Sequence, residues 1–257
     1  MAKYEEELQI ALEAARAGAR IVSENYGKFQ VSNTKENAKG LVTQTDLEAE
    51  KAIIQILQSK SKYNILSEES GSLGKSTGPI WVVDPLDGTN NFARSLPLFA
   101  VSVGLMDEDE SLLGVIIDPV QNKEFYALKN KGAYCDGKRL QLSYFNTEYI
   151  PSIFLNHGYD EADRNKFKKL SQIFASSYNI LKLGTTALEL CYVANGSVDA
   201  FICSGDAIWD FAAGIVIAQE SGYIFTDWQG NKWERGNDHL LIARPEIHKE
   251  IIDLIKG

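Results

Sequence analysis

An apolar run that ends in two aspartates constrains this chain more than any other segment. The run covers Ile80 to Val83, and the chain continues as Asp84-Pro85-Leu86-Asp87-Gly88-Thr89. Four successive large apolar residues indicate a buried strand, while the proline and the glycine indicate a turn directly after it. The strand would therefore bring two carboxylates to the end of an apolar layer, where they repel each other unless a cation lies between them.

The same segment offers ligands for a cation and for a phosphate. The carboxylates of Asp84 and Asp87 and the carbonyl of Leu86 are the oxygen ligands that Mg²⁺ and Ca²⁺ prefer. The amides of Gly88 and Thr89 would begin a short helix or nest, which suits a phosphate. A capped turn would explain any one of these residues. It does not explain two acids at the mouth of an apolar strand.

Two further acidic clusters are less specific when taken alone. Ser67-Glu68-Glu69-Ser70 follows a short apolar pair, and a solvated acidic loop would have the same sequence. Asp210 lies where a helix is expected to begin, a position at which an acid is also stabilised by the helix dipole. Gly184-Thr185-Thr186 could face a ligand, although capping of the following helix would explain it.

The order of the expected elements predicts an α/β protein with an α+β N-terminal half. Helices are expected at 4–26 and from Thr45, because Thr45 to Glu48 has the form of a capping box. Strands then follow one another, with a hairpin turn at Asp136-Gly137. The expected strands before this turn are 65–66, 80–83, 99–106, 112–117 and 124–128.

The C-terminal half alternates strands and helices, which is typical of an α/β arrangement. The expected strands are 153–155, 180–183, 198–202, 224–225 and 240–243, and the expected helices are 160–176, 185–194, 211–221 and a last one from Pro245. We therefore expect one half at residues 1–145, with most of the candidate ligands, and a second half at residues 146–257, with Asp210.

Charge and hydropathy exclude several classes of partner. The net charge of −9 argues against non-specific binding to nucleic acid, which requires a cationic surface. No apolar run approaches the roughly 20 residues that span a bilayer, and the N-terminus lacks the pattern of a signal peptide. The three widely spaced cysteines fit neither a disulfide framework nor a zinc site. We therefore expect a cytoplasmic protein without a membrane or nucleic-acid partner.

Taken together, these clusters resemble the inositol monophosphatase family of metal-dependent, lithium-sensitive sugar phosphatases. The run from Asp84 to Phe92 and the run Trp209-Asp210-Phe211-Ala212-Ala213-Gly214 are similar to the two family signatures, in the same order and with the same separation. The resemblance covers nearly the whole chain. It implies a layered α/β/α/β/α sandwich of the sugar phosphatase type, assembled as a homodimer, that hydrolyses a small phosphorylated metabolite with two or three Mg²⁺ ions per active site.

The resemblance also implies a role for individual residues. The metal ligands would be Glu68, Asp84, the Leu86 carbonyl, Asp87 and Asp210. The catalytic residues would be Asp46 and Thr89, which would orient a water, and Glu69, which would support Glu68; Lys35 would lie near the site. The substrate would be bound by Gly88, Thr89, Thr186, Cys203, Asp206 and Asp210. Magnesium would neutralise the phosphate, activate the water and stabilise the leaving alkoxide.

One departure from the family concerns the substrate. Inositol-specific members have a glutamate seven residues before Asp210, and this chain has Cys203, whose thiol is a weak hydrogen-bond partner. Asp206 lies nearby and could take over that contact. Inositol phosphate or another polyol or sugar phosphate is therefore the first expectation. Fructose-1,6-bisphosphatase, histidinol-phosphatase and 3′-phosphonucleotide phosphatase activities stay open, as does a regulatory binding protein with secondary phosphatase activity.

Overall fold

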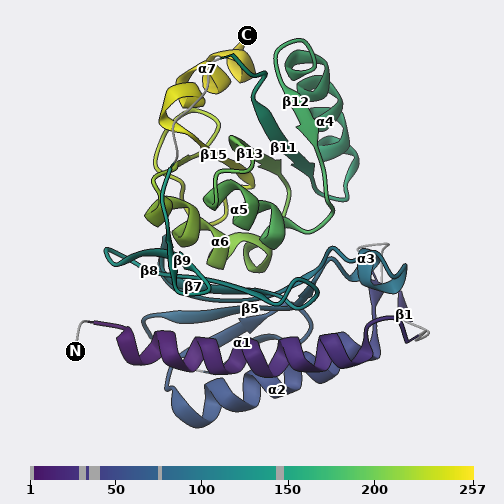
Figure 1. Cartoon of the computed structure of the whole chain (residues 1–257), viewed down its shortest axis with the longest axis vertical. Coiled ribbons are helices and arrows are strands. Elements are labelled where there is room, and N and C mark those ends of the chain that lie inside the picture. Colours follow the sequence, from purple (N-terminus) through teal and green to yellow (C-terminus); the bar gives the residue numbers. More distant parts are fainter. Residues whose placement is uncertain (1–2, 29–32, 35–40, 75–76, 143–147) are drawn as a thin grey trace.

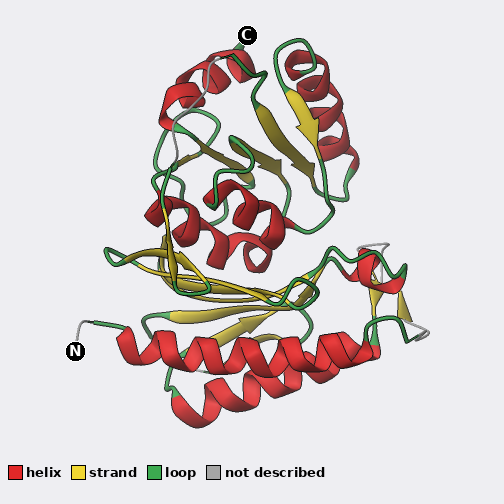
Figure 2. Ribbon diagram, in the orientation of Figure 1, coloured by secondary structure: helices red, strands yellow, loops and turns green. Residues whose placement is uncertain are grey.

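Helices and β-sheets alternate in five layers in the computed structural model (Figure 1, Figure 2), which describes residues 3–28, 33–34, 41–74, 77–142 and 148–257. Two helical layers cover the outer faces of two sheets, and a third lies between the sheets. From the N-terminal face to the C-terminal face, the helices are α1 (Glu5–Asn25) with α2 (Gln44–Lys60), then α5 (Thr186–Ala194) with α6 (Ile208–Ser221), then α4 (Glu161–Phe174) with α7 (Pro245–Lys256). The expected α/β/α/β/α layering is confirmed.

The first sheet has eight strands in the order β10-β9-β8-β7-β6-β5-β3-β4, and its neighbours are antiparallel except for β3 and β5. Its strands are β3 (Asn64–Ser67), β4 (Gly71–Leu73), β5 (Ile80–Asp87), β6 (Ala100–Asp107), β7 (Glu110–Asp118), β8 (Lys123–Leu128), β9 (Gly132–Cys135) and β10 (Lys138–Leu140). The predicted hairpin is confirmed, because Asp136 and Gly137 join β9 to β10 with φ values of 49° and 75°. Two short strands, β1 (Asn33–Thr34) and β2 (Leu41–Val42), pair separately.

The second sheet has five strands in the order β12-β11-β13-β15-β14. They are β11 (Ser152–His157), β12 (Asn179–Leu181), β13 (Ala200–Ser204), β14 (Ile224–Thr226) and β15 (His239–Ala243). β11 is parallel to β12 and to β13, so the predicted α/β alternation is confirmed. The expected boundary near residue 145 lies outside the described residues and stays a prediction.

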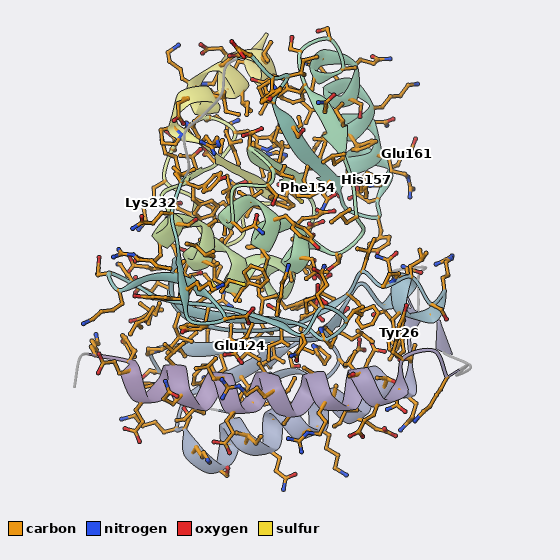
Figure 3. The ribbon with its side chains drawn as sticks, in the orientation of Figure 1. Tyr26, Glu124, Phe154, His157, Glu161 and Lys232 are labelled. Carbon is orange, nitrogen blue, oxygen red and sulfur yellow. The ribbon has the colours of Figure 1, made fainter. Side chains whose placement is uncertain are left out.

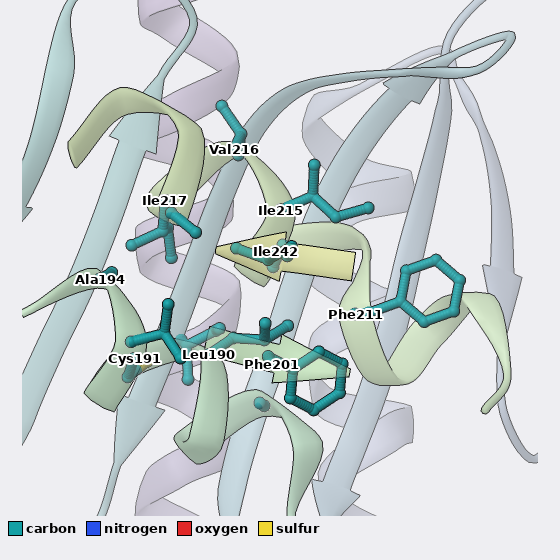
Figure 4. Packing of buried hydrophobic residues seen from close by; sticks show 14 of the residues in the cluster. Leu190, Cys191, Ala194, Phe201, Phe211, Ile215, Val216, Ile217 and Ile242 are labelled. Carbon is teal, nitrogen blue, oxygen red and sulfur yellow. The ribbon is translucent and has the colours of Figure 1, made fainter. Parts of the chain in front are cut away.

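The layer between the sheets fixes the position of α6. Gly114 on β7 lies so close to α6 that a methyl group on it would overlap the backbone of Ala213. Apolar side chains of α5 and α6 fill the space up to the second sheet (Figure 4). Among them, Leu190 and Ile215 pack near Phe201 and Ile242 of the second sheet. The contact at Ala213 therefore fixes α6 relative to the first sheet.

The start of α2 differs from the prediction. The helix begins at Gln44, and the capping box joins Thr43 to Asp46, two residues before the predicted one. The Thr43 amide donates to Asp46 Oδ2 at 2.8 Å, and the Asp46 amide donates to the Thr43 hydroxyl at 3.4 Å. The prediction was wrong because the pair Thr45/Glu48 has the same three-residue spacing as the pair Thr43/Asp46. Among the described residues, no helix combines the length and the apolar character needed to cross a bilayer.

Candidate active site

A bulge in β5 places both aspartates of the central motif on one side. Asp84 pairs with Ser102 and Asp87 pairs with Ala100, so β5 contains one residue more than β6 between these pairs. In a regular strand, residues three apart point to opposite faces. The additional residue turns Asp87 back toward Asp84, and Pro85 is tolerated because a bulge interrupts the hydrogen-bond ladder.

Asp210 from α6 completes a compact group of three carboxylates. Carboxylate oxygens of Asp84, Asp87 and Asp210 lie within 4.8 Å of one another. Asp84 and Asp87 are buried, and Asp210 is half-buried. The Leu86 amide donates to Asp84 Oδ1 at 2.9 Å, and the Ala207 amide donates to Asp210 Oδ2 at 2.8 Å. These three side chains could hold a metal ion.

Burial and mutual repulsion disfavour the charged forms of this group. Burial raises the pKa of Asp84 well above its usual value, and the charges of Glu68, Asp87 and Asp210 add to the effect. Burial also raises the pKa of Asp87 to about 7, although hydrogen bonds from Thr185 and Ala187 oppose it. The pKa of Asp210 is raised well above its usual value by burial and by neighbouring carboxylates. A divalent cation would relieve this repulsion, so the donor set fits one.

Glu68 lies outside the compact group but within its electrostatic field. Its loop is held by Glu50, a buried residue of α2 whose role was not predicted. Glu50 Oε1 accepts from the amides of Glu69 at 3.1 Å and Ser70 at 3.0 Å, and it also accepts from the Ser67 hydroxyl. The i, i+4 spacing of Asp46 and Glu50 puts both acids on one face of α2. This spacing is the sequence signal from which the role of Glu50 could have been predicted.

The predicted water-orienting pair is in contact. The Thr89 hydroxyl lies 2.9 Å from Asp46 Oδ1 and 2.9 Å from the Leu86 carbonyl oxygen, so either can accept its proton. Thr89 opens the short helix α3 (Thr89–Ala93), as expected, and Gly88 precedes it with a φ of 91°. A side chain on Gly88 would also approach the Leu98 carbonyl to 2.8 Å. Lys35 lies outside the described residues.

Residues of the second half hold Asp87 in place. The Thr185 hydroxyl and the Ala187 amide donate to Asp87 Oδ2 at 2.7 Å and 2.6 Å. Thr185 does occupy the N-cap position of α5, but its side chain makes no capping bond, so the capping explanation of this segment is wrong. Asn91 adds a second link, because its amide nitrogen donates to the carbonyls of Leu98 and Leu183, both at 2.8 Å. The role of Asn91 was not predicted.

The expected substrate-binding residues lie beside this group. The Thr186 hydroxyl donates to Asp206 Oδ2 at 2.7 Å, and Asp206 is half-buried. The Cys203 side chain is fully buried on β13, and burial raises the pKa of its thiol well above the usual value. This thiol interacts with Asp206, so Cys203 could influence a substrate through Asp206.

Comparison with known proteins agrees with this geometry. The model of the inositol monophosphatase family matches residues 3–256. The Nus factor SuhB of Pasteurella multocida is 33% identical, over 97% of this chain and 95% of the relative, and the inositol-1-monophosphatase of Synechocystis is 32% identical, over 95% and 86%. The crystal structure of the extragenic suppressor protein suhB from Bartonella henselae superposes with a TM-score of 0.90 at 28% identity, covering 98% of both chains. The chain therefore belongs to the inositol monophosphatase family.

Proposed function

We propose that this protein is a Mg²⁺-dependent phosphomonoesterase that hydrolyses a small polyol or sugar phosphate, such as inositol monophosphate. The observation that carries the proposal is the group formed by Asp84, Asp87 and Asp210. Carboxylate oxygens of these residues lie within 4.8 Å of one another, and burial and mutual repulsion raise their pKa values. The acid of a structural ion pair lies beside a basic side chain, whereas these three acids lie beside one another near the start of α3, where a cation would stabilise their charged forms.

The residues that would hold two or three Mg²⁺ ions are Glu68, Asp84, the Leu86 carbonyl, Asp87 and Asp210. All are oxygen ligands, which Mg²⁺ prefers. When bound, magnesium would neutralise phosphate charge, activate a water and stabilise the leaving alkoxide. Glu69 would support Glu68 from the same loop. Glu50 would keep that loop in place through its bonds to the backbone.

The side chains around these ligands would position the water and the ester. If the Thr89 hydroxyl donates to Asp46, its lone pairs are left to accept a hydrogen bond from a water. That bond would turn the lone pair of the water toward phosphorus. The amides of Gly88 and Thr89, at the N-terminus of α3, would donate to the phosphate oxygens. The roles of Asp46, Glu69 and Thr89 are part of this proposal.

The alcohol portion of the substrate would meet the second half of the chain. Asp206 is a hydrogen-bond acceptor held by Thr186, and it suits the hydroxyl groups of a polyol or a sugar. Cys203 would act through Asp206, and Asp210 would contact both metal and substrate. We also propose a cytoplasmic homodimer, in keeping with the resemblance.

Phosphate release from purified protein tests the proposal. We expect Mg²⁺-dependent release from a panel of sugar, polyol and nucleotide phosphates, and its loss in Asp84→Asn. Asp118→Asn is a matched control, because Asp118 is equally buried in the same sheet but accepts from the turn amides of Val120 and Gln121, outside the acidic group. Equal release from the wild type and Asp84→Asn would refute the metal-site assignment. No release from any ester by the wild type would refute the phosphatase.

A regulatory role is the second candidate, because several similar proteins are named Nus factor SuhB. The net charge of −9 makes a protein partner more suitable than bare nucleic acid. Such a role would persist in Asp84→Asn, whereas the phosphatase role would not. Complementation of a deletion strain by the inactive variant would therefore favour regulation.

A further inference from the structure

Asp163, in the first turn of α4, places its carboxylate where β11 and β13 end. Only 5% of this residue is exposed. The Ser204 hydroxyl, at the end of β13, donates to Asp163 Oδ1 at 2.7 Å, and Lys166 Nζ lies 3.4 Å from the same oxygen. An acid so deeply buried requires such partners. None of the roles described above uses it.

Two glycines show how closely the strand ends pack around this carboxylate. A methyl group on Gly158, after β11, or on Gly205, after β13, would overlap Asp163 Oδ2. The two glycines also touch each other, since a methyl group on Gly205 would lie 3.0 Å from the Cα of Gly158. The Gly158 amide donates to the Ser204 carbonyl at 2.6 Å. Asp163 thus fills the space between the ends of two parallel strands.

The residues that follow these glycines border the active site. Asp206 follows Gly205 and accepts a hydrogen bond from the Thr186 hydroxyl. Tyr159 follows Gly158; its pKa is raised by partial removal from water and by the carboxylates of Asp210, Asp206, Glu68 and Asp87. Tyr159 nevertheless remains 60% exposed, so its phenol can meet a ligand. His157 and Glu161, which flank this segment in the sequence, are labelled on the right of the view in Figure 3, the side on which Figure 1 labels α3. Ligands commonly bind at the carboxyl ends of parallel strands.

We propose that Asp163 is a positioning residue that holds the Gly158-Tyr159 and Gly205-Asp206 segments together and thereby sets selectivity for the alcohol portion of the phosphate ester. The proposal rests on the phosphatase function proposed above. The metal ligands have contacts of their own, because Asp84 accepts from the Leu86 amide within β5 and Asp210 accepts from the Ala207 amide at the N-cap of α6. Loss of Asp163 would therefore loosen the recognition of hydroxyl groups more than the attack on phosphorus.

Kinetics with two esters test this selectivity. Inositol 1-phosphate has hydroxyl groups around its ester, and p-nitrophenyl phosphate has none. In Asp163→Ala, and more mildly in Ser204→Ala, we expect kcat/KM for inositol 1-phosphate to fall about ten- to hundred-fold. We expect kcat/KM for p-nitrophenyl phosphate to stay within about threefold. Equal losses for both esters, or no loss for either, would overturn the proposal.

Asp227→Ala is the matched control for stability. Asp227 lies in the same half, is 7% exposed and accepts two turn amides, those of Gln229 and Asn231, at 2.8 Å. Its loss should lower the melting temperature without changing the ratio between the two esters. If Asp227→Ala shifts this ratio as much as Asp163→Ala does, general destabilisation explains the effect and the positioning role is refuted.

Amide hydrogen exchange gives a readout that needs no activity. In Asp163→Ala, the segments around Gly158 and Gly205 should exchange faster, because the bonds from Gly158 to Ser204 and from Gly205 to Asp238 lose their support. Asp227→Ala should leave both segments unchanged. Unchanged exchange in Asp163→Ala would refute the positioning role even in an active enzyme. An inactive wild type with faster exchange in this variant would refute the phosphatase and retain the positioning role.

Discussion

The substitution Glu189→Gln should remove a large pH dependence from the stability of the protein. Glu189 lies in α5 with no exposed surface, and its Oε1 accepts from the amides of Leu183 at 2.6 Å and Gly184 at 3.2 Å. Burial raises its pKa from 4.5 to about 8, and the charges of Asp206 and Asp87 add to the rise. Its amide hydrogen bonds oppose the rise but do not cancel it.

The sign and size of the effect follow from this pKa. Between pH 4.5 and about 8, folded Glu189 holds a proton that the unfolded chain has lost. The free energy of unfolding therefore falls as pH rises through this interval, by about 1.4 kcal/mol per pH unit. Over the whole interval the loss approaches about 5 kcal/mol, and it levels off above the folded pKa. Glutamine has no proton to lose, so the variant lacks this slope.

Asn156 explains why a neutral side chain is accommodated. Its Nδ2 donates to Glu189 Oε2 at 2.5 Å, while its Oδ1 has no partner among the described residues. A 180° rotation of the Asn156 amide would bring Oδ1 against Glu189, where it can accept from a protonated carboxyl or from a glutamine amide. The network can therefore satisfy the neutral form.

Urea unfolding in the presence of a chelator, between pH 5.5 and 8, provides the measurement. The stability of Glu189→Gln relative to the wild type should increase with pH by about 1.4 kcal/mol per unit. The difference between the two proteins removes the contributions of the other acids. Glu161→Gln, at an exposed position of α4, is the control substitution of the same chemistry. A difference for Glu189→Gln that does not change with pH would refute the reasoning.

Two other substitutions test the support of the candidate site. Glu50→Gln weakens the bonds that hold the Glu68 loop. The Mg²⁺ concentration for half-maximal phosphate release should therefore rise about ten- to hundred-fold, while kcat at saturating Mg²⁺ should change less. An unchanged Mg²⁺ titration would contradict this role of Glu50. Gly114→Ala forces a methyl group into the backbone of Ala213, which should cost about 1–3 kcal/mol and lower kcat by displacing α6. Gly27→Ala, at a φ of 76° with open space around it, should reduce stability without lowering kcat.

The elements that the sequence predicted are those whose signals are local. The apolar run before Asp84 is enough to identify β5. Asp136-Gly137 identifies the hairpin between β9 and β10, because both residues must adopt a positive φ. The start of α2 was misplaced for an equally local reason. Thr43 and Thr45 each precede an acid by three residues, and nothing in the pattern separates them.

The contacts that support the candidate site could not be predicted in this way. Thr185 looks like a helix cap, and only the approach of the two halves turns its hydroxyl toward Asp87. Glu50 and Asp163 look like ordinary polar residues of helices until burial and their partners are known. Such contacts join residues far apart in the chain, so their signal is tertiary. The acids themselves were predictable because their spacing is compressed into short motifs.

A shared arrangement of donors explains how the three acids can be gathered although no ion pair joins them to a basic side chain in the part of the chain that the structure describes. Asp84, Asp87 and Asp210 each bind a neutral donor through one carboxylate oxygen. The donors are the amides of Leu86, Ala187 and Ala207 and the hydroxyl of Thr185. Neutral donors orient a carboxylate and oppose part of its desolvation, but they leave its negative charge in place. A lysine or arginine in the same position would cancel that charge and fill the centre of the group. These donors thus orient the acids, and a bound cation would stabilise their charged forms, which is what a metal-dependent phosphatase requires.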